Sequence, residues 1–321
     1  MDGGLFKKEK PITLSLIIFT FLCFLFFSTN AQALVYCVGC SGATAGTCTG
    51  GVACGAPCNT GTNGVVCPTI AAALTCINNN NDLNATIRLA QNSPMMPYTG
   101  PGSSNVINNT ESAAQTINIL GGWTATTCAT QTVNPTNTIV EAPMDDRVFL
   151  INNTTNFALD VTLEGLTITG GDPMPNCDGV NGGGVCVTSS SGTGGVIFTS
   201  STNIYDDNMA NASGGGLAVI TQVGGNIMAT TTDDTFTNNS ATSLGGAMLF
   251  LSDGETLDAT ISGDIIGGDS PFPLGGNESA ADGGGIVIVG TDDGELNVTS
   301  QGNLIKSNSS DGGGGRWGFD H

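Results

Sequence analysis

Short apolar runs alternate with small polar residues along most of this chain. The runs are four or five residues long, and nearly all of them end at Gly, Asn or Asp. Such runs are typical of β-strands bounded by tight turns, whereas helix-type spacing of apolar residues is nearly absent after residue 80. The pattern therefore predicts an all-β protein with strands in these segments: 86–89, 116–120, 148–151, 161–163, 166–168, 195–198, 217–220, 248–251 and 286–289.

One phrase recurs in the last third of the chain: an Asn, five mostly small residues, two glycines, one small residue and one apolar residue. It occurs at 208–217, 239–248 and 277–286, and its glycine half also stands at 182–184 and, in weaker form, at 312–315. The five glycine runs start 32, 31, 38 and 29 residues apart. A period near 30 residues indicates stacked supersecondary units.

Residues 214–244 show what one unit contains. After the glycines come a strand at 217–220, a turn at 224–225, a second strand at 226–230, a third at 235–237 and a polar turn at 238–240. Three short strands and three turns in about 30 residues form one coil of a parallel β-helix, in which strands of successive coils pair about 4.8 Å apart. About eight such coils are expected.

The repeated residues have structural roles in such a coil. Glycine accepts left-handed or crowded backbone at a corner, which is the role expected for Gly215, Gly216, Gly245, Gly246, Gly283 and Gly284. Asn208, Asn239 and Asn277 are expected to stack their side-chain amides in a hydrogen-bonded ladder. The alternative, a ligand site made by these asparagines, is much the weaker interpretation because the phrase is so regular.

The N-terminus has the three parts of a secretory signal. Three lysines precede an apolar stretch at 12–27, and Ala31-Gln32-Ala33 supplies a small-x-small cleavage site. An uncleaved anchor helix is the alternative, but 16 residues are few for a membrane span. No second segment of membrane-spanning length follows. The domains expected are a signal peptide at 1–33, a cysteine-rich N-terminal cap at 34–80, whose residues 69–74 form a short capping helix, and the β-helix at 81–321.

The cysteines point to disulfides. Removal of the signal leaves ten of the eleven cysteines, an even number that suits an exported chain. The cysteines expected in disulfides are Cys37, Cys40, Cys48, Cys54, Cys58, Cys67, Cys76, Cys128, Cys177 and Cys186. The Cys37-x-x-Cys40 pair also suits zinc or redox chemistry, but no second such pair accompanies it, and His321 is the only histidine. A disulfide-stapled cap is the favoured interpretation.

The charge balance is strongly acidic, with 27 Asp and Glu against 7 Lys and Arg. A surface of this kind repels nucleic acid and anionic membranes, so neither is expected as a partner. Acid pairs such as Asp206-Asp207 and Asp233-Asp234 are typical of solvated turns. No calcium loop is present, and no cofactor is expected beyond incidental calcium binding.

Two segments resemble a known family. Tyr205-Asp206-Asp207-Asn208 and Phe236-Thr237-Asn238-Asn239, each followed by its glycine pair, are similar to the FxxN and GGAI-type repeats of chlamydial polymorphic outer-membrane proteins and related autotransporter passenger domains. The resemblance covers roughly residues 66–315 and implies a right-handed, single-stranded, pectin-lyase-like parallel β-helix in a bacterial protein that is secreted or held at the cell surface. Residues 316–321 follow a glycine corner without the expected strand or membrane barrel, which suggests a truncated gene product or a fragment.

The scaffold hosts many activities, so function has to be argued from individual residues. We expect an exported, non-enzymatic adhesion or scaffold module that binds a host-surface or extracellular glycan or protein. One alternative is a β-helical polysaccharide lyase or glycoside hydrolase with an atypical site, for which Arg147 beside Asp145 and Asp146 is the one conceivable catalytic group. A surface ion pair is the more ordinary reading of those residues. Another alternative is a nonfunctional remnant of a longer passenger domain. Function is expected where the repeat is interrupted: the cap, the loop at 171–181, or the insertion at 267–276.

Overall fold

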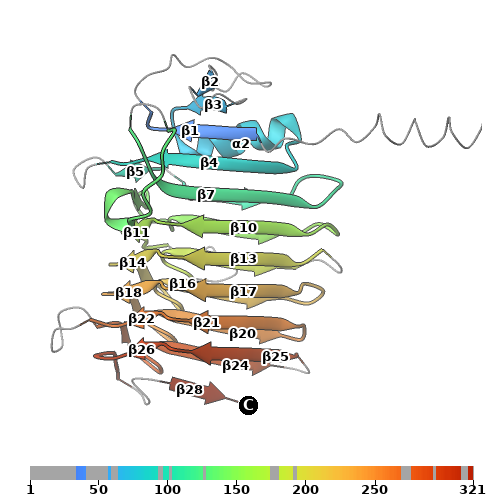
Figure 1. The fold of residues 1–321 in the computed structure, drawn as a ribbon. Helices are drawn as coiled ribbons and strands as arrows, with labels where there is room; N and C mark the ends of the chain where they lie inside the picture. The colour runs from blue at the N-terminus through green and yellow to red at the C-terminus, as the bar shows by residue number, and fades with distance from the viewer. Residues whose placement is uncertain are drawn as a thin grey trace, which may run out of the picture. The chain divides into compact units, whose positions relative to one another are not determined.

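Parallel strands stacked coil upon coil make up nearly all of the structure (Figure 1). The structure is a computed structural model that describes residues 34–40, 57–58, 64–92, 97–100, 103–125, 128–173, 181–190, 194–268, 276–291, 294–311 and 317–320. The predicted signal peptide, residues 41–56 and 59–63 of the cysteine-rich segment, and most of the 171–181 and 267–276 loops lie outside these residues.

The strands form four sheets, which we call A to D. Sheet A has ten strands in the order β2 (Pro57–Cys58), β3 (Gly64–Cys67), β1 (Leu34–Val38), β4 (Asn84–Ala90), β7 (Gln115–Trp123), β10 (Leu159–Glu164), β13 (Val196–Ser201), β17 (Ile227–Thr232), β21 (Leu257–Ser262) and β25 (Leu296–Gln301). Sheet B has seven: β5 (Tyr98–Thr99), β8 (Ile139–Glu141), β11 (Thr167–Thr169), β14 (Ile204–Asp206), β18 (Thr235–Thr237), β22 (Ile265–Ile266) and β26 (Leu304–Ile305).

Sheet C also has seven strands: β6 (Asn105–Asn108), β9 (Phe149–Asn153), β12 (Val185–Ser189), β16 (Leu217–Thr221), β20 (Met248–Asp253), β24 (Ile286–Thr291) and β28 (Trp317–Asp320). Sheet D has four short strands: β15 (Met209–Ala210), β19 (Ser240–Ala241), β23 (Glu278–Ser279) and β27 (Ser309–Ser310). Every pairing between these strands is parallel except that of β2 with β3.

The chain visits the sheets in a fixed order, so each round is one coil. In the later coils it passes from sheet A to B, D and C, as in β17, β18, β19 and β20. Sheets B and C each contribute one strand per coil, which makes seven coils, and β1 pairs with β4 as a further layer of sheet A. The predicted all-β parallel β-helix of about eight coils is therefore confirmed.

The predicted capping helix is also present, and it is longer than expected. Helix α2 (Ile70–Asn80) begins at Thr69, whose side chain accepts a hydrogen bond from the backbone N–H of Ala72 at 3.1 Å. Its apolar residues recur at three- and four-residue intervals, and the buried ones are Ile70, Ala73, Leu74, Cys76 and Ile77. These side chains join the core cluster at the N-terminal end of the coils and so cover its apolar interior.

The interior is filled by inward-facing apolar side chains stacked from coil to coil. Sheet A strands alternate in burial, and in β17 Ile227 and Ala229 point inward while Met228 is exposed. On sheet B the rings of Tyr205 and Phe236 stack with centroids 4.4 Å apart. Because each coil places an apolar residue at the same register, one continuous core runs along the stack.

Two glycines are needed at each corner before sheet C, for two different reasons. Gly214 has φ +69°, a left-handed conformation that side chains other than glycine seldom adopt. Gly215 lies so close to the next coil that a Cβ there would stand 2.3 Å from the carbonyl oxygen of Gly246. The same two roles fall to Gly245 and Gly246 in the following coil.

Two expectations about strands need correction. Residues 238–240 are not only a turn, because Ser240 begins the short strand β19, which pairs with β15 and β23. Residues 317–320 form the strand expected after the last glycine corner, since Trp317 pairs with Ile286 of β24. Both segments lack the apolar run that marks the longer strands.

We expect Gly215→Ala to destabilise the fold by about 2–3 kcal/mol, because the new methyl group would collide with backbone that cannot move away. Chemical denaturation of the two proteins measures the difference. Gly290→Ala is the matched control, since its nearest neighbour would be a Leu296 side-chain carbon at 3.8 Å, and it should change stability by less than about 0.5 kcal/mol. Equal effects of the two substitutions would contradict the close-approach explanation.

Candidate functional site

The predicted asparagines lie at the corner between sheets B and D, which we call the second corner. The Asn208 amide donates to Oδ1 of Asn239 at 2.9 Å, and the Asn239 amide donates to Oδ1 of Asn277 at 2.9 Å. The Asn277 amide continues the ladder to Oδ1 of Asn308 at 2.8 Å. Sequence reasoning missed Asn308, although it precedes the weak glycine run as the other three precede theirs.

Each rung also binds the backbone of the neighbouring coil. The amide of Asn239 donates to the carbonyl oxygen of Tyr205 at 2.9 Å, and its Oδ1 accepts from the backbone N–H of Asn208 at 3.2 Å. Asn208, Asn239 and Asn277 are at most 1% exposed. Their donors and acceptors are used within the stack, so the arrangement suits a structural ladder rather than a ligand site.

A second ladder stands at the first corner, between sheets A and B, and sequence reasoning missed it. Its members are Asn203, Asp234, Asp264 and Asn303. The Oδ1 atom of each of the last three accepts a hydrogen bond from the backbone N–H of the ladder residue one coil earlier. The distances are 2.7 Å for Asp234, 2.9 Å for Asp264 and 2.8 Å for Asn303. The expectation of a solvated Asp233-Asp234 turn is therefore wrong for Asp234, which is fully buried.

The reason for this error lies in the backbone of the corner. Asp233 is exposed and has φ +54°. Thr202 and the glycines at the equivalent position of other coils have similar positive φ values. This left-handed residue reverses the direction of the chain and turns the next side chain inward. Two adjacent aspartates consequently have opposite surroundings.

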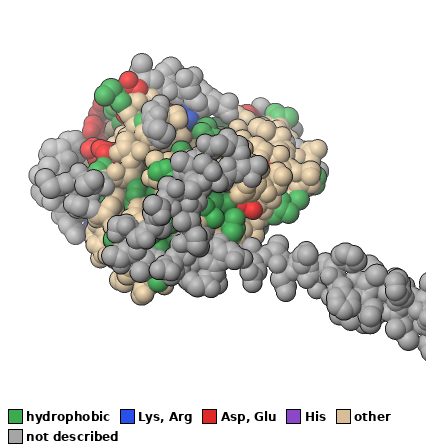
Figure 2. Space-filling view, turned by 90° about the horizontal axis from the view of Figure 1, so that it is seen from above, with side chains coloured by type: hydrophobic (Ala, Val, Ile, Leu, Met, Phe, Trp, Pro, Cys, Tyr) green, Lys and Arg blue, Asp and Glu red, His purple; other side chains and the backbone are tan. Residues whose placement is uncertain are grey.

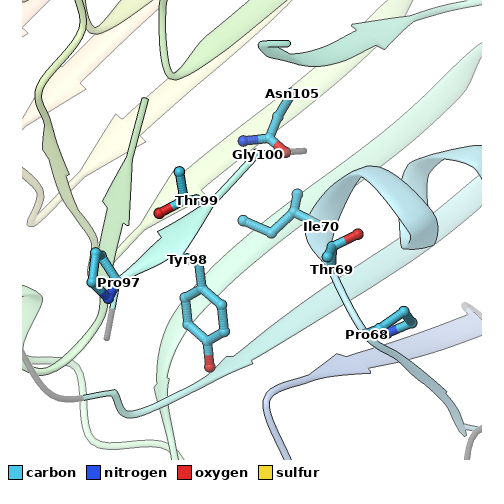
Figure 3. Close-up of a pocket in the computed structure, with 8 residues that line it drawn as sticks. All are labelled: Pro68, Thr69, Ile70, Pro97, Tyr98, Thr99, Gly100 and Asn105. Carbon is cyan, nitrogen blue, oxygen red and sulfur yellow. The ribbon is translucent and has the colours of Figure 1, made fainter. Parts of the chain in front are cut away.

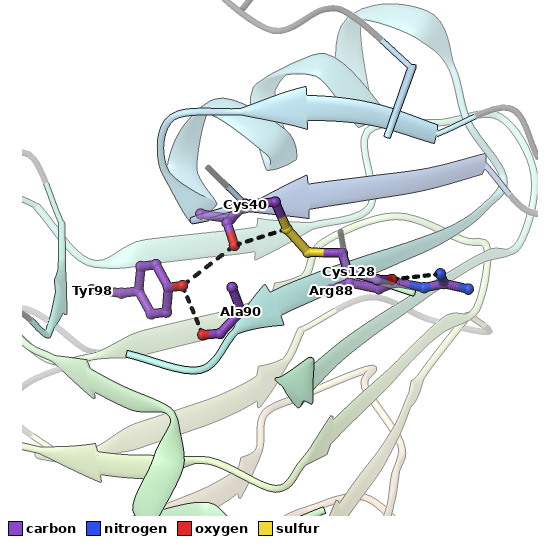
Figure 4. The surroundings of a disulfide bond; sticks show 6 residues. Cys40, Arg88, Ala90, Tyr98 and Cys128 are labelled. Atoms are coloured by element: carbon purple, nitrogen blue, oxygen red, sulfur yellow. Dashed lines mark hydrogen bonds between the residues drawn. A yellow bond between two sulfur atoms is a disulfide. The ribbon is translucent and has the colours of Figure 1, made fainter. Parts of the chain in front are cut away.

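The cysteine-rich segment is joined to the coils by a disulfide. Cys40, just after β1, is bonded to Cys128, 88 residues later in the turn after β7 (Figure 4). Among the other predicted cysteines, Cys37, Cys67, Cys76 and Cys186 are disulfide-bonded, Cys58 lies in β2, and Cys48, Cys54 and Cys177 lie outside the described residues. The sulfurs of Cys37, Cys40 and Cys128 lie within 4.8 Å of one another, but their disulfide bonds leave no thiolate for a metal.

Around this disulfide the outer face of sheet A is covered by apolar side chains. Val35, Cys37, Val66 and Trp123 pack with the disulfide in a second apolar cluster. The guanidinium of Arg88 lies 4.0 Å from the centre of the Trp123 ring and donates to the Cys128 carbonyl oxygen at 3.0 Å. This basic residue is therefore engaged with the disulfide turn.

Arg147 does not form an exposed catalytic group. It is only 2% exposed, so neither the catalytic interpretation nor the surface ion pair expected from the sequence agrees with its position. The neighbouring Asp146 accepts the backbone N–H of Ser104 at 2.8 Å and that of Arg147 at 2.8 Å. These contacts fix a turn before sheet C.

A small pocket of about 150 Å³ lies beside the start of α2 (Figure 3). Its walls include Thr69, Ile70, Tyr98 and Asn105. The Tyr98 hydroxyl donates to the Ala90 carbonyl oxygen at 2.8 Å, and the Asn105 amide to that of Val148 at 3.1 Å. Burial raises the pKa of the Tyr98 hydroxyl, so Tyr98 stays protonated and acts as a structural donor.

Beyond the disulfide cluster, the outer face of sheet A carries columns of hydroxyl side chains. The central column runs in register through Thr162, Thr199, Thr230, Thr260 and Thr299. Beside it, two positions along each strand, stand Ser201, Thr232 and Ser262. Sequence reasoning missed these columns, whose signal is a Thr-x-Ser/Thr triplet at 199–201, 230–232 and 260–262.

A shallow groove borders the columns at the strand starts. It has a volume of about 320 Å³ and is lined by residues that include Ile197, Asn226, Met228, Thr256 and Asp258. Ile197 is 41% and Met228 53% exposed, and the two are paired across β13 and β17. The face thus offers hydroxyl groups beside a small apolar strip.

The described surface seen in Figure 2 carries more acidic than basic side chains. Seen from above the view of Figure 1, acidic side chains gather at one edge, and little basic surface appears among the described residues (Figure 2). Among the residues that the structure describes, no helix has the length and apolar character needed to cross a membrane.

We expect Asn239→Ala to lower the free energy of unfolding by about 3 kcal/mol, because it leaves buried amide and backbone groups in two coils without partners. Urea denaturation measures the loss. Asn297→Ala is the control: its amide binds only the exposed carboxylates of Asp258 and Glu295, so it should cost less than about 0.5 kcal/mol. Similar losses from both substitutions would show that the ladder has no special role.

Removal of the disulfide should loosen the N-terminal end of the stack. The double variant Cys40→Ala/Cys128→Ala should be less stable by about 4 kcal/mol, since the bond closes a loop of 88 residues. Thermal unfolding measures the loss, and limited proteolysis should cut first between 34 and 67. A double variant as stable as the parent protein would refute this role.

No protein family model, curated protein or solved structure matches this chain. The parallel β-helix therefore stands on the strand pairing itself. The comparisons do not test the resemblance to chlamydial surface proteins, which enters below only as part of a proposal.

Proposed function

We propose that this chain is an exported, non-enzymatic binding module whose outer sheet A face holds a neutral glycan. The observation that supports this most is the pair of hydroxyl columns centred on Thr199, Thr230 and Thr260. These side chains face away from the core, so besides supporting the sheet through cross-strand pairs their hydroxyls are available to a partner.

The hydroxyl columns suit a repetitive, hydroxyl-rich partner. Each threonine hydroxyl can donate one hydrogen bond and accept two, and its β-branched side chain is stiff. Strand pairing repeats the hydroxyls about every 4.8 Å, so a polymer can make many weak contacts at once. The exposed side chains of Ile197 and Met228 add apolar contact for the faces of sugar rings.

Charge favours an uncharged partner over an acidic one. The chain has a formal net charge of −20, and its acidic residues include Asp160, Glu164 and Asp258 around the hydroxyl columns. An anionic polysaccharide would be repelled by this surface. Neutral polysaccharides are the class that meets no such penalty.

The enzyme alternative is weakened because its best candidate residue, Arg147, is buried. Of the other basic residues after residue 33, Arg88 lies against Trp123 and Lys306 lies in the last described coil. Lyases and hydrolases of acidic polysaccharides need an exposed basic group near carboxylates. This favours binding over turnover of an acidic polysaccharide.

The resemblance to chlamydial polymorphic outer-membrane proteins and other pectin-lyase-like passenger domains supports the same proposal. On this basis we propose a bacterial protein, either secreted or at the cell surface, with the right-handed coil of that group. The disulfide between Cys40 and Cys128 agrees with export, because such bonds persist in oxidising compartments.

Retention on insoluble cellulose, chitin and mannan, with polygalacturonate as the acidic comparison, tests the proposal. The protein should bind at least one neutral polymer, and Thr230→Lys/Thr260→Lys should weaken binding at least tenfold. Thr242→Lys, in the segment after β19, is the control that adds the same kind of charge outside the face. Equal retention of all variants, or release of reducing ends by the folded protein, would contradict the proposal.

A further inference from the structure

The first-corner ladder contains two carboxyl groups in positions that are built for amides. Its members Asn203 and Asn303 each use the side-chain NH₂ group to donate to a carbonyl oxygen of the preceding coil. The acceptors are Leu163 at 2.9 Å and Ile261 at 2.8 Å. For Asp234 the equivalent carbonyl of the preceding coil is that of Ser200, because Ser200 is the register partner of Leu163. Only a protonated carboxyl group can donate a hydrogen bond as those amides do.

Asp234 lacks a donor for its second oxygen. Its Oδ1 accepts from the backbone N–H of Asn203, whereas Oδ2 is buried and has no hydrogen-bond partner in the described structure. The Ser200 hydroxyl bonds the Tyr205 hydroxyl at 2.7 Å, and its effect on Asp234, which lowers the pKa, is smaller than that of burial; the Thr231 hydroxyl donates to Asp264 at 2.6 Å. A bare carboxylate at this position would be an uncompensated buried charge.

Asp264 has a different balance. Its Oδ2 accepts the Thr231 hydroxyl, and its Oδ1 accepts the backbone N–H of Asp234. These two donors favour the ionised form, while complete burial opposes it. The two carboxyls thus differ in how well each can carry a charge.

Among the described residues that act on the pair, none is a cation. The titratable groups that act on the two carboxyls are Tyr205, which is fully buried, Asp233, which is exposed, and the carboxyls themselves. All of these are neutral or negative. Burial, aided by the neighbouring acids, raises the pKa of Asp234 well above its ordinary range, and burial raises the pKa of Asp264 to about 6.

We propose that Asp234 and Asp264 form a proton-binding site inside the ladder, so that mild acid strengthens the middle of the stack. Asp234 holds a proton in the folded protein at neutral pH. Asp264 binds its proton in mild acid and releases it as the medium becomes neutral. The proposal does not depend on the binding function of sheet A.

The direction of the pH effect follows from the raised pKa values. A group whose pKa is higher in the folded state stabilises that state fully below its unfolded pKa and loses this contribution as the pH rises through the folded value. For Asp264 the window runs from about pH 4 in the unfolded chain to about pH 6 in the folded one. Asp234 extends the decline to higher pH.

Denaturation midpoints measured from pH 4 to pH 8 test the proposal. The midpoint of the parent protein should fall as the pH rises, and Asp234→Asn/Asp264→Asn should have a higher midpoint at pH 7 and a flatter profile. Asp82 and Asp160 also have raised pKa values, so the difference between the two profiles is the relevant quantity. Asp207→Asn is the control, because Asp207 is an exposed left-handed corner residue at the second corner.

An infrared measurement on the parent protein does not depend on the folding of any variant. A protonated carboxylic acid band should persist at pH 7, where exposed carboxyls are ionised. In folded Asp234→Asn that band should be lost. Absence of the band in the parent protein, or a double variant that keeps the parent profile or is less stable than the parent at pH 7, would overturn the proposal.

Discussion

The first and second corners of this β-helix depend on hydrogen bonds that their own coil cannot make. Where the chain turns between sheets, backbone N–H groups no longer face a strand partner, and buried groups of this kind must be paired. The side chain of the next coil supplies the acceptor, as Oδ1 of Asn239 does for Asn208. One coil is therefore incomplete without the next, and the stack is held together at its corners as well as by its sheets.

This dependence requires a constant distance between successive coils at the ladder residues. The ladder acceptors reach their donors only if successive coils keep the strand spacing, and Gly215 and Gly246 permit that approach on the side of sheet C. Extra residues are accommodated at the second corner without a break in the ladder: the interval of 38 residues includes the 267–276 insertion, which lies between β22 and Asn277. The same regularity carries over to the outer face of sheet A, where a side chain repeated once per coil becomes a straight column.

The sequence allowed much of the fold to be predicted, because the features that repeat are also the features that build the coil. The strands of sheets A and C have apolar runs, and the glycine corners are distinctive. By contrast, β19 has only Ser240 and Ala241, whose pairing depends on neighbouring coils rather than on local preference. The bond between Cys40 and Cys128 joins two distant segments, and cysteine order alone does not determine such a pairing.

The candidate sites were harder to predict, since they depend on which way a side chain points. Asp234 follows an exposed aspartate and reads as a turn residue until it is aligned with Asn203 and Asn303 in neighbouring coils. Thr230 is an ordinary strand residue until its partners Thr199 and Thr260 are known. Arg147 beside two aspartates reads as a surface group, although the turn buries it.

The two corners also differ in a way that explains where acids are tolerated. At the second corner each amide donates both to a carbonyl oxygen and to the next amide oxygen, so a carboxylate would break both bonds. At the first corner hydroxyl groups stand beside the ladder: Ser300 accepts from the Asn303 amide at 2.8 Å, while Thr231 donates to Asp264. A hydroxyl can serve either as donor or as acceptor, so this corner accepts an amide in one coil and a carboxyl in the next. The buried carboxyl groups of Asp234 and Asp264 are therefore found at the corner whose neighbours can adjust to either protonation state.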